Sequence, residues 1–401
     1  MSELFSAVKE ANVEKIKDLL DNGADVNSKD EDENTPLIMA VSSGDIDLCK
    51  LLIDNRANVN SQNSKGDTPL ILAVDATLAA GGAHNIELCK LLIDNCADVN
   101  SQNINGNTPL HCAAAGVEGG VGEGRPGRSG KVIFELCTLL INNRAAVNPQ
   151  NNSGDTPLIL AILYGEIDIC TLLINNRANV NLKGESSALD IAIVSADDPP
   201  PHRWIELCKL LIDNGAAVNP QDEDAPITLA VTGNNIEMVE LLLSEGADIT
   251  ITSNKGKTPL HAAVKSLGGG GRGGVKIDMV RLLLSKGANI NSQDDEGETP
   301  LHGAVKYNDI EMVQLLLSEG ADITITSNAG DTPSNLTSNE EILQFIRHIE
   351  YANTQPRSAG TAGGSKRRKS KRKSKKSKSK KRKSKKRKSK KSKSKRKSKK
   401  R

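Results

Sequence analysis

Apolar and polar residues are arranged with the periodicity of an α-helix, and this pattern recurs along the chain. In residues 300–307 (PLHGAVKY) and 309–320 (DIEMVQLLLSEG), apolar residues recur at the three- and four-residue spacing of one helix face. Thr299 can cap the first helix, and Pro300 suits its first turn, where a backbone N–H is not needed. Gly320 ends the second helix, where a left-handed residue is favoured. The pattern predicts two short helices, followed by an extended segment and a turn.

This unit recurs along most of the chain at steps close to 33 residues, with insertions. The threonines of its Thr-Pro motif are Thr35, Thr68, Thr108, Thr156, Thr258, Thr299 and Thr332. Degenerate copies begin at Ser187 and Ala225, and residues 2–27 form an incomplete first copy. A unit of this length cannot bury its own apolar face, so such units stack. The sequence therefore predicts an all-α solenoid of helix-turn-helix repeats joined by hairpin loops.

Several copies depart from the common unit. Four carry insertions between their two helices, and we expect these to be loops projecting from one edge. The insertions lie around residues 76–83, 116–131, 195–203 and 266–275. The repeats near Ser187 and Ala225 have hairpins two residues shorter, which predicts a soft region between them.

Two expectations concern helix ends. In four copies, the helix-ending glycine is replaced by Arg56, Cys96, Arg144 and Arg177. A left-handed residue there lowers local stability, unless the preceding asparagine takes that conformation. Residues 337–351 (TSNEEILQFIRHIEY) predict a final helix that begins with a capping box from Ser338 to Glu341.

The motifs GNTPLHCAAAG at 106–116 and GKTPLHAAVKS at 256–266 resemble the ankyrin-repeat family. The resemblance covers residues 1–351 and implies nine to ten units, counting the end caps. It implies that His111, His261 and His302 form structural hydrogen bonds between neighbouring repeats. It also places an asparagine in the hairpin of seven copies. This asparagine is either a turn-stabilising residue, which we favour, or a target of an asparaginyl hydroxylase.

Nothing in the sequence favours catalysis or a bound metal. Five of the seven cysteines share one slot of the repeat, and Val239 and Val280 fill it in later copies, so the slot is a buried apolar position. The GKT at 256–258 lacks the first glycine of a phosphate loop, since Ile251 stands there. No Ser-His-Asp or Cys-His arrangement has a plausible spacing. We expect a non-enzymatic protein with no cofactor, no metal and no small-molecule substrate.

Charge divides the chain into two parts. Residues 365–401 hold 20 Lys, 7 Arg and 10 Ser, which is 27 of the 53 basic residues and none of the 50 acids. The remaining residues therefore have roughly 24 more acids than bases. We expect residues 1–351 to form the solenoid, 352–364 a flexible linker and 365–401 a disordered basic tail.

The resemblance implies protein partners that bind at the hairpin tips and the inner faces of the first helices. Several tips are acidic, which favours a basic partner and faster encounter, although any one tip can simply be a solvated turn. The candidate partner-binding residues are Asp30, Asp32, Lys65, Asn105, Asn152, Glu185, Asp222, Glu223, Asp224, Lys255, Asp294, Asp295 and Glu296. We expect the protein to be a monomer.

The tail allows three interpretations. It can neutralise phosphates of nucleic acid or another polyanion without reading sequence, it can act as a nuclear-localisation signal, or it can fold back on the acidic repeats. The candidate targeting residues are Lys366, Arg367, Arg368, Lys369, Lys371, Arg372 and Lys373. Phosphorylation of the ten serines would cancel most of its charge.

The sequence thus predicts an interaction scaffold that its tail directs to the nucleus or to polyanions. One alternative is a nucleic-acid- or chromatin-associated protein whose tail is the principal binding element. Another is an adaptor for ubiquitin ligases. No run of about 18 apolar residues suggests a membrane span. We expect an intracellular protein, in the nucleus or alternatively in the cytoplasm.

Overall fold

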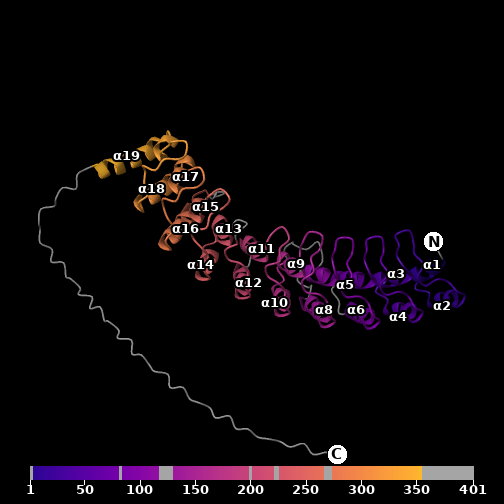
Figure 1. The fold of residues 1–401 in the computed structure, drawn as a ribbon. Coiled ribbons are helices and arrows are strands. Elements are labelled where there is room, and N and C mark those ends of the chain that lie inside the picture. The colour runs from indigo at the N-terminus through magenta and orange to yellow at the C-terminus, as the bar shows by residue number, and fades with distance from the viewer. Residues whose placement is uncertain are drawn as a thin grey trace, which may run out of the picture. The chain divides into compact units, whose positions relative to one another are not determined.

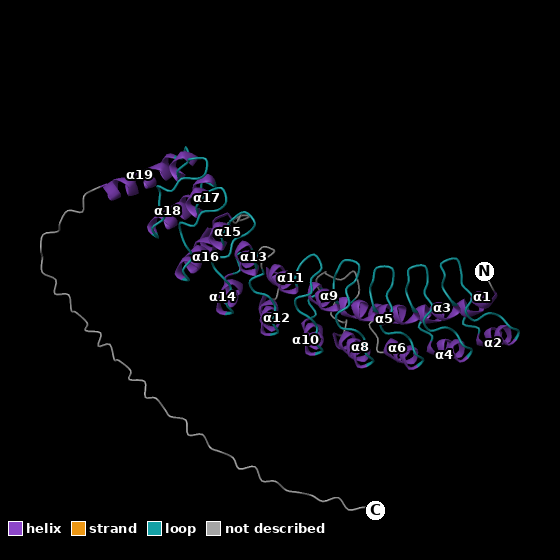
Figure 2. Ribbon diagram, viewed as in Figure 1, coloured by secondary structure: helices purple, strands orange, loops and turns teal. Residues whose placement is uncertain are grey.

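A computed structural model describes residues 3–80, 84–116, 130–197, 201–220, 225–265 and 273–354. In this part of the chain, nine helix pairs follow one another, and no strand occurs (Figures 1 and 2). The first helices of successive pairs pack against each other in one row, and each second helix packs on its own first helix. The predicted all-α repeat fold is confirmed.

The first helices, called inner helices below, are all short. They are α1 (Glu3–Lys9), α3 (Pro36–Ser43), α5 (Pro69–Ala80), α7 (Pro109–Ala115), α9 (Pro157–Leu163), α11 (Ala188–Val194), α13 (Pro226–Thr232), α15 (Pro259–Lys265) and α17 (Pro300–Lys306). The second helices, called outer helices, form a second row beside them (Figure 2). They are α2 (Val13–Asp21), α4 (Ile46–Asp54), α6 (His84–Asp94), α8 (Gly130–Asn142), α10 (Ile167–Asn175), α12 (Pro201–Asp213), α14 (Ile236–Ser244), α16 (Gly273–Ser285) and α18 (Ile310–Ser318).

The sequence signals that begin the inner helices act as expected. Thr35 has an extended backbone, and its hydroxyl accepts a hydrogen bond from the N–H of Ile38, while Pro36 occupies the first turn. Thr156 caps α9 in the same way through the N–H of Ile159. Because each inner helix starts at the same point of its repeat, its apolar residues meet those of the next repeat. One continuous core therefore runs through the described repeats.

The cysteine slot is a core position, as predicted. The five cysteines in it have no exposed surface, and they lie in the middle of outer helices. They are Cys49, Cys89, Cys137, Cys170 and Cys208. Burial raises the pKa of Cys49 to about 12, so its thiol stays protonated at neutral pH. The slot therefore contributes packing rather than chemistry.

The insertions differ from the predicted loops where the structure describes them. Residues 76–80 continue α5 as helix, and the Thr77 hydroxyl donates to the carbonyl of Ala73 at 2.6 Å. The expectation of a loop from residue 76 is wrong, because the alanine-rich sequence favours helix. Helices α8, α12 and α16 each have 13 residues, against nine in α10, since the ends of three insertions lengthen them. Residues 81–83, 117–129, 198–200 and 266–272 lie outside the described part.

The residues that replace the helix-ending glycine take the left-handed conformation themselves. Arg56, Cys96, Arg144 and Arg177 have φ between 67° and 69°. The preceding Asn55 keeps a φ of −91° and uses its side-chain amide to cap the carbonyl of Leu51 at 2.8 Å. The alternative in which this asparagine takes the strained conformation is wrong. Each such non-glycine residue costs roughly 1–2 kcal/mol.

The last described elements close the array. The short helix η2 (Pro333–Leu336) packs on α17, whereas the other short helix, η1 (Ser195–Asp197), lies within the array after α11. The final helix α19 (Glu340–Thr354) exists as predicted, but Asn339 begins it rather than Ser338. The carbonyl oxygen of the Asn339 side chain accepts from the N–H of Glu341 at 2.9 Å. No described helix is long and apolar enough to span a bilayer.

By its contacts, the chain divides into a unit of residues 1–352 and a second unit of residues 353–401. The described residues of the second unit end at 354. The predicted linker at 352–364 lies almost wholly outside the described part, and the predicted tail at 365–401 lies entirely outside it.

Candidate functional site

The hairpin asparagines link each repeat to the next. The side-chain amide of Asn60 donates to the carbonyl of Cys96 at 3.1 Å, and its oxygen accepts from the N–H of Asp98 at 2.7 Å. The same pair of bonds recurs from Asn27, Asn100, Asn148, Asn181 and Asn219. These asparagines hold two repeats together, which is more than the predicted role within one turn.

This asparagine ladder stops at Thr250. Its N–H and hydroxyl both donate to Asp248 within the same hairpin, and no described bond joins its side chain to the next repeat. The ladder resumes at Asn291, whose oxygen accepts from the N–H of Asp322 at 2.8 Å. The interface that follows Thr250 therefore lacks a link that the earlier interfaces have.

The histidines of the TPLH motif bond between repeats, as predicted. Nε2 of His111 lies 3.1 Å from the carbonyl of Asp155, while Nδ1 accepts from the N–H of Thr108. Nε2 therefore carries the proton, and the ring is neutral. Burial lowers the pKa of His111, and of His261 in a later repeat. These rings support the hairpins and leave no free nitrogen for catalysis.

The hairpin tips are tight turns held by one polar side chain each. Asn103 accepts from the N–H groups of Asn105 and Asn107 at 3.0 Å, and Asp30, Asn63, Asn151 and Asp294 do the same in other repeats. Neighbouring tips then bond through their backbones. The N–H of Ile104 donates to the carbonyl of Lys65, and the N–H of Asn152 donates to that of Asn105. The tips form a second ladder beside the asparagine ladder.

The predicted partner-binding residues differ in how far their side chains are exposed. Exposed side chains at the tips belong to Asp32, Lys65, Asn105, Asn152, Glu185, Lys255, Asp295 and Glu296. Asp30 is half-buried in its own turn, and Asp294 is only 7% exposed, so both serve mainly to build hairpins. Asp222, Glu223 and Asp224 lie outside the described residues, as do all seven candidate targeting residues at 366–369 and 371–373.

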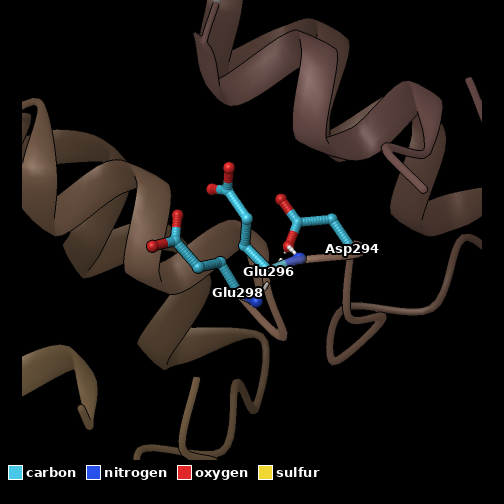
Figure 3. A group of neighbouring side chains, drawn as sticks. All are labelled: Asp294, Glu296 and Glu298. Atoms are coloured by element: carbon cyan, nitrogen blue, oxygen red, sulfur yellow. Dashed lines mark hydrogen bonds between the residues drawn. The ribbon is translucent and has the colours of Figure 1, made fainter. Parts of the chain in front are cut away.

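Three carboxylates of one hairpin come close enough to resemble a metal site. The ligand atoms of Asp294, Glu296 and Glu298 lie within 4.8 Å of one another (Figure 3). Two of the three carboxylates already have a lysine partner, because Lys257 pairs with Asp294 at 3.6 Å and Lys306 pairs with Glu298. The Glu298 contact raises the pKa of Lys306. The group therefore fits an internal ion-pair network better than a cation site.

The inner helices turn an apolar stripe towards the hairpin side. Leu160 lines a hollow together with hairpin residues, and Leu163 lies one turn further along the same helix face. Ile191 and Val194 hold the equivalent positions of α11. Leu163 is 47% exposed and Val194 is 65% exposed. We call Leu160, Leu163, Ile191 and Val194 the inner stripe. Its apolar surface is available to a partner.

The hollow beside the stripe lies between α5, α7, α9 and their hairpins. Its volume is about 600 Å³, and we call it the acidic hollow. The apolar lining includes Leu78, Cys112, Ala115, Leu160 and Tyr164, and the carboxylates are those of Asp67, Asp75 and Asp155. No lysine, arginine or histidine other than the neutral His111 is among the described residues that line it.

Comparison with known proteins identifies the repeat. The pattern described as "Ankyrin repeats (3 copies)" matches residues 4–78, 128–222, 201–294 and 271–327, and "Ankyrin repeats (many copies)" matches 76–116. The chain belongs to the ankyrin-repeat family. Ankyrin repeats generally serve as protein–protein interaction modules, and the fold is typically a non-enzymatic scaffold. No curated protein sequence matches this chain.

Solved ankyrin-repeat structures resemble part of the array. The ankyrin repeat domain of Bcl-3, a member of the IkappaB protein family, is 26% identical, with a TM-score of 0.48, and the match covers 61% of this chain and 99% of that one. The human ASB11 ankyrin repeat domain is 24% identical, with a TM-score of 0.47, covering 59% of this chain and 97% of that one.

The ankyrin array presents two features that the sequence analysis did not single out. The inner stripe uses the same residue types as the core, and only its place on the inner helices distinguishes it. The acidic hollow joins residues from three repeats. The sequence does contain a signal for the stripe. The fourth residue after the capping threonine is Leu160 in one repeat and Gly303 in another, and the seventh is Leu163 or Lys306. Core positions, in contrast, stay apolar in the different repeats.

Proposed function

We propose that this protein is a non-enzymatic scaffold that captures protein partners on the hairpin side of its ankyrin repeats. The inner stripe carries this proposal. Val194 and Leu163 expose large parts of apolar side chains on consecutive helices, although apolar side chains gain by burial. A partner that covers them would gain roughly 25 cal/mol for each Å² of apolar surface removed from water.

The test compares proteins retained from a cell extract by the full chain and by two double variants. Leu163→Glu with Val194→Glu places charges in the inner stripe, and we expect it to lose the retained partner. Val13→Glu with Phe134→Glu makes the same changes at two residues that are each 40% exposed on outer helices. We expect this control to retain the partner. Equal retention by both variants would show that the stripe is not the binding surface.

The basic tail supports a second role, in targeting. Residues 365–401 concentrate 27 positive charges without an aromatic residue, which suits sequence-independent binding to phosphates or recognition as a nuclear signal. We propose that the tail directs the scaffold to the nucleus or to polyanions, with Lys366–Lys369 as the first cluster. The alternative, in which the tail is the principal binding element, predicts that the repeats contribute no partner of their own.

Deletion of residues 365–401 separates these roles. The scaffold proposal predicts that nuclear association is lost in imaging of expressing cells, while the partner captured through the inner stripe is still retained. Loss of every associated protein on deletion would favour the tail as the principal binding element. Unchanged nuclear accumulation would contradict targeting by the tail.

A further inference from the structure

Asp67 and Asp155 are two of the carboxylates that line the acidic hollow. Asp67 accepts a hydrogen bond from the side-chain amide of Asn103 at 3.0 Å, and Asp155 lies in the hairpin of the next repeat but one. Neither carboxylate forms an ion pair with a described lysine or arginine. The apolar part of the lining includes Leu160 and Tyr164.

In a second hollow of the same array, lysines of the chain itself form ion pairs with the acids. It lies between α15, α17 and their hairpins, and Lys257, Lys265 and Lys306 line it beside the acids. Two of these lysines pair with Asp294 and Glu298. The corresponding inner-helix positions near the acidic hollow are Ala115 and Leu163. Among the described residues, the later hollow thus has lysines beside its acids, whereas Asp67 and Asp155 have none.

The surroundings of Asp155 favour the arrival of a cation. Burial raises the pKa of this carboxyl group, and the nearby Glu185 carboxylate raises it further. Both effects disfavour the ionised form, and a positive charge placed against Asp155 would oppose them. A cation with an apolar stem would also cover Leu160 and the ring of Tyr164.

We propose that the acidic hollow binds an extended segment of a partner protein in which arginine side chains alternate with apolar residues. This inference rests on the proposed scaffold function and specifies the chemistry of the partner. Arginine fits better than lysine, because its planar guanidinium pairs with a carboxylate through two parallel bonds and stacks on an aromatic ring. Asp67 and Asp155 supply the carboxylates, and Tyr164 supplies the ring.

The test uses the full chain and a fluorescein-labelled octapeptide in which arginine and leucine alternate. A second peptide carries citrulline in place of arginine, which keeps the shape and removes the charge. Binding is measured by fluorescence anisotropy at low ionic strength. We expect the citrulline peptide to bind about tenfold more weakly or worse, since charged hydrogen bonds are the stronger ones.

Two double variants locate the binding. Asp67→Asn with Asp155→Asn removes two charges from the hollow and keeps the acceptor for Asn103, because Asn34 and Asn107 already accept the same bond in other repeats. Asp54→Asn with Asp94→Asn removes two charges at exposed ends of the outer helices α4 and α6. We expect a loss of about tenfold for the hollow variant and a change of less than about twofold for the control.

Three results would overturn the assignment. The first is an equal loss in both variants, which would indicate a general charge effect. The second is the absence of binding, or equal binding of the citrulline peptide; the scaffold function would still stand if the inner-stripe variant loses its partner. The third is a synthetic peptide of residues 365–401 that binds more tightly than the arginine–leucine peptide and depends on Asp67 and Asp155. It would assign the hollow to the chain's own basic segment.

Discussion

Exchanging asparagine and threonine in the hairpin ladder should move stability in opposite directions at two neighbouring interfaces. Asn219 donates to the carbonyl of Gly246 at 2.9 Å and accepts from the N–H of Asp248 at 2.8 Å. Thr250, one repeat later, makes no such link. Asn219→Thr removes a link, and Thr250→Asn creates one.

The size of the effect follows from the bonds exchanged. A neutral hydrogen bond contributes about 0.5–1.5 kcal/mol, and these bonds are exposed, so the lower part of that range applies. Asn219→Thr loses two bonds and gains none, because Ala217 has no acceptor to replace the Asp248 carboxylate that Thr250 uses. We expect it to lower the free energy of unfolding by about 1–2 kcal/mol. Thr250→Asn gains two bonds and loses one, for a net gain of roughly 0.5–1 kcal/mol.

Urea denaturation followed by circular dichroism measures the change, and amide hydrogen exchange in α14 and α16 locates it. Asn214→Thr is the control, because the Asn214 amide bonds only to the carbonyl of Leu210 in its own helix. We expect the control to cost less than half as much as Asn219→Thr. Equal losses of stability in Asn219→Thr and Asn214→Thr, or a loss of stability in Thr250→Asn, would contradict the linking role of these asparagines.

Three further predictions concern other parts of the repeat. Gly106→Ala should lower the free energy of unfolding, measured by urea denaturation, by roughly 2–3 kcal/mol, since a Cβ there would lie 2.9 Å from the backbone of the next hairpin at a φ of 76°. Gly215 has open space around it, so Gly215→Ala should lower this free energy by only about 1 kcal/mol. Stability should be fullest above pH 6.5 and fall as the pH drops below it, because burial lowers the pKa of His111 and the unfolded chain then binds more protons. His111→Ile should weaken this dependence of the melting temperature on pH, and an unchanged profile would contradict the assignment. Cys96 is the exposed cysteine, so a thiol reagent should modify it in the native protein well before the five buried thiols of the outer helices, and equal rates would contradict the packing.

The repeat architecture was predictable because the same pattern occurs in many copies, and each copy supports the same prediction. Thr-Pro at a helix start and glycine at a helix end have local physical causes, so they hold wherever they occur. The alternation of Cys49 and Val239 in one slot is enough by itself to indicate a buried apolar position, and both side chains are fully buried. The extension of α5 through residue 80 was missed, because a short alanine-rich insertion has no residue that stops a helix.

The site was less predictable, because it depends on neighbours that are distant in sequence. Asn100 bonds to residues 44 and 46 positions away, and nothing local to Asn100 identifies them. From the sequence, Asp294 was expected to be an exposed acid at a hairpin tip, yet it is buried in its turn beside Lys257. Val194 has the composition of a core residue, and its exposure follows from the absence of a facing element among the described residues. The partner-binding roles assigned to the exposed tips stay predictions.

The two ladders also bear on how such an array can lengthen or shorten. The donor and acceptor that Asn27 meets in the second repeat are the same backbone groups that Asn60 and Asn148 meet in theirs. If a whole repeat were inserted or deleted at one of these junctions, the asparagines on both sides could therefore form the same pair of bonds with their new neighbours. The junction after Thr250 is different, since a unit with asparagine at this position would form two bonds there that Thr250 does not make. Gain or loss of a copy should thus preserve the ladder bonds at the asparagine junctions and change their number at the junction after Thr250.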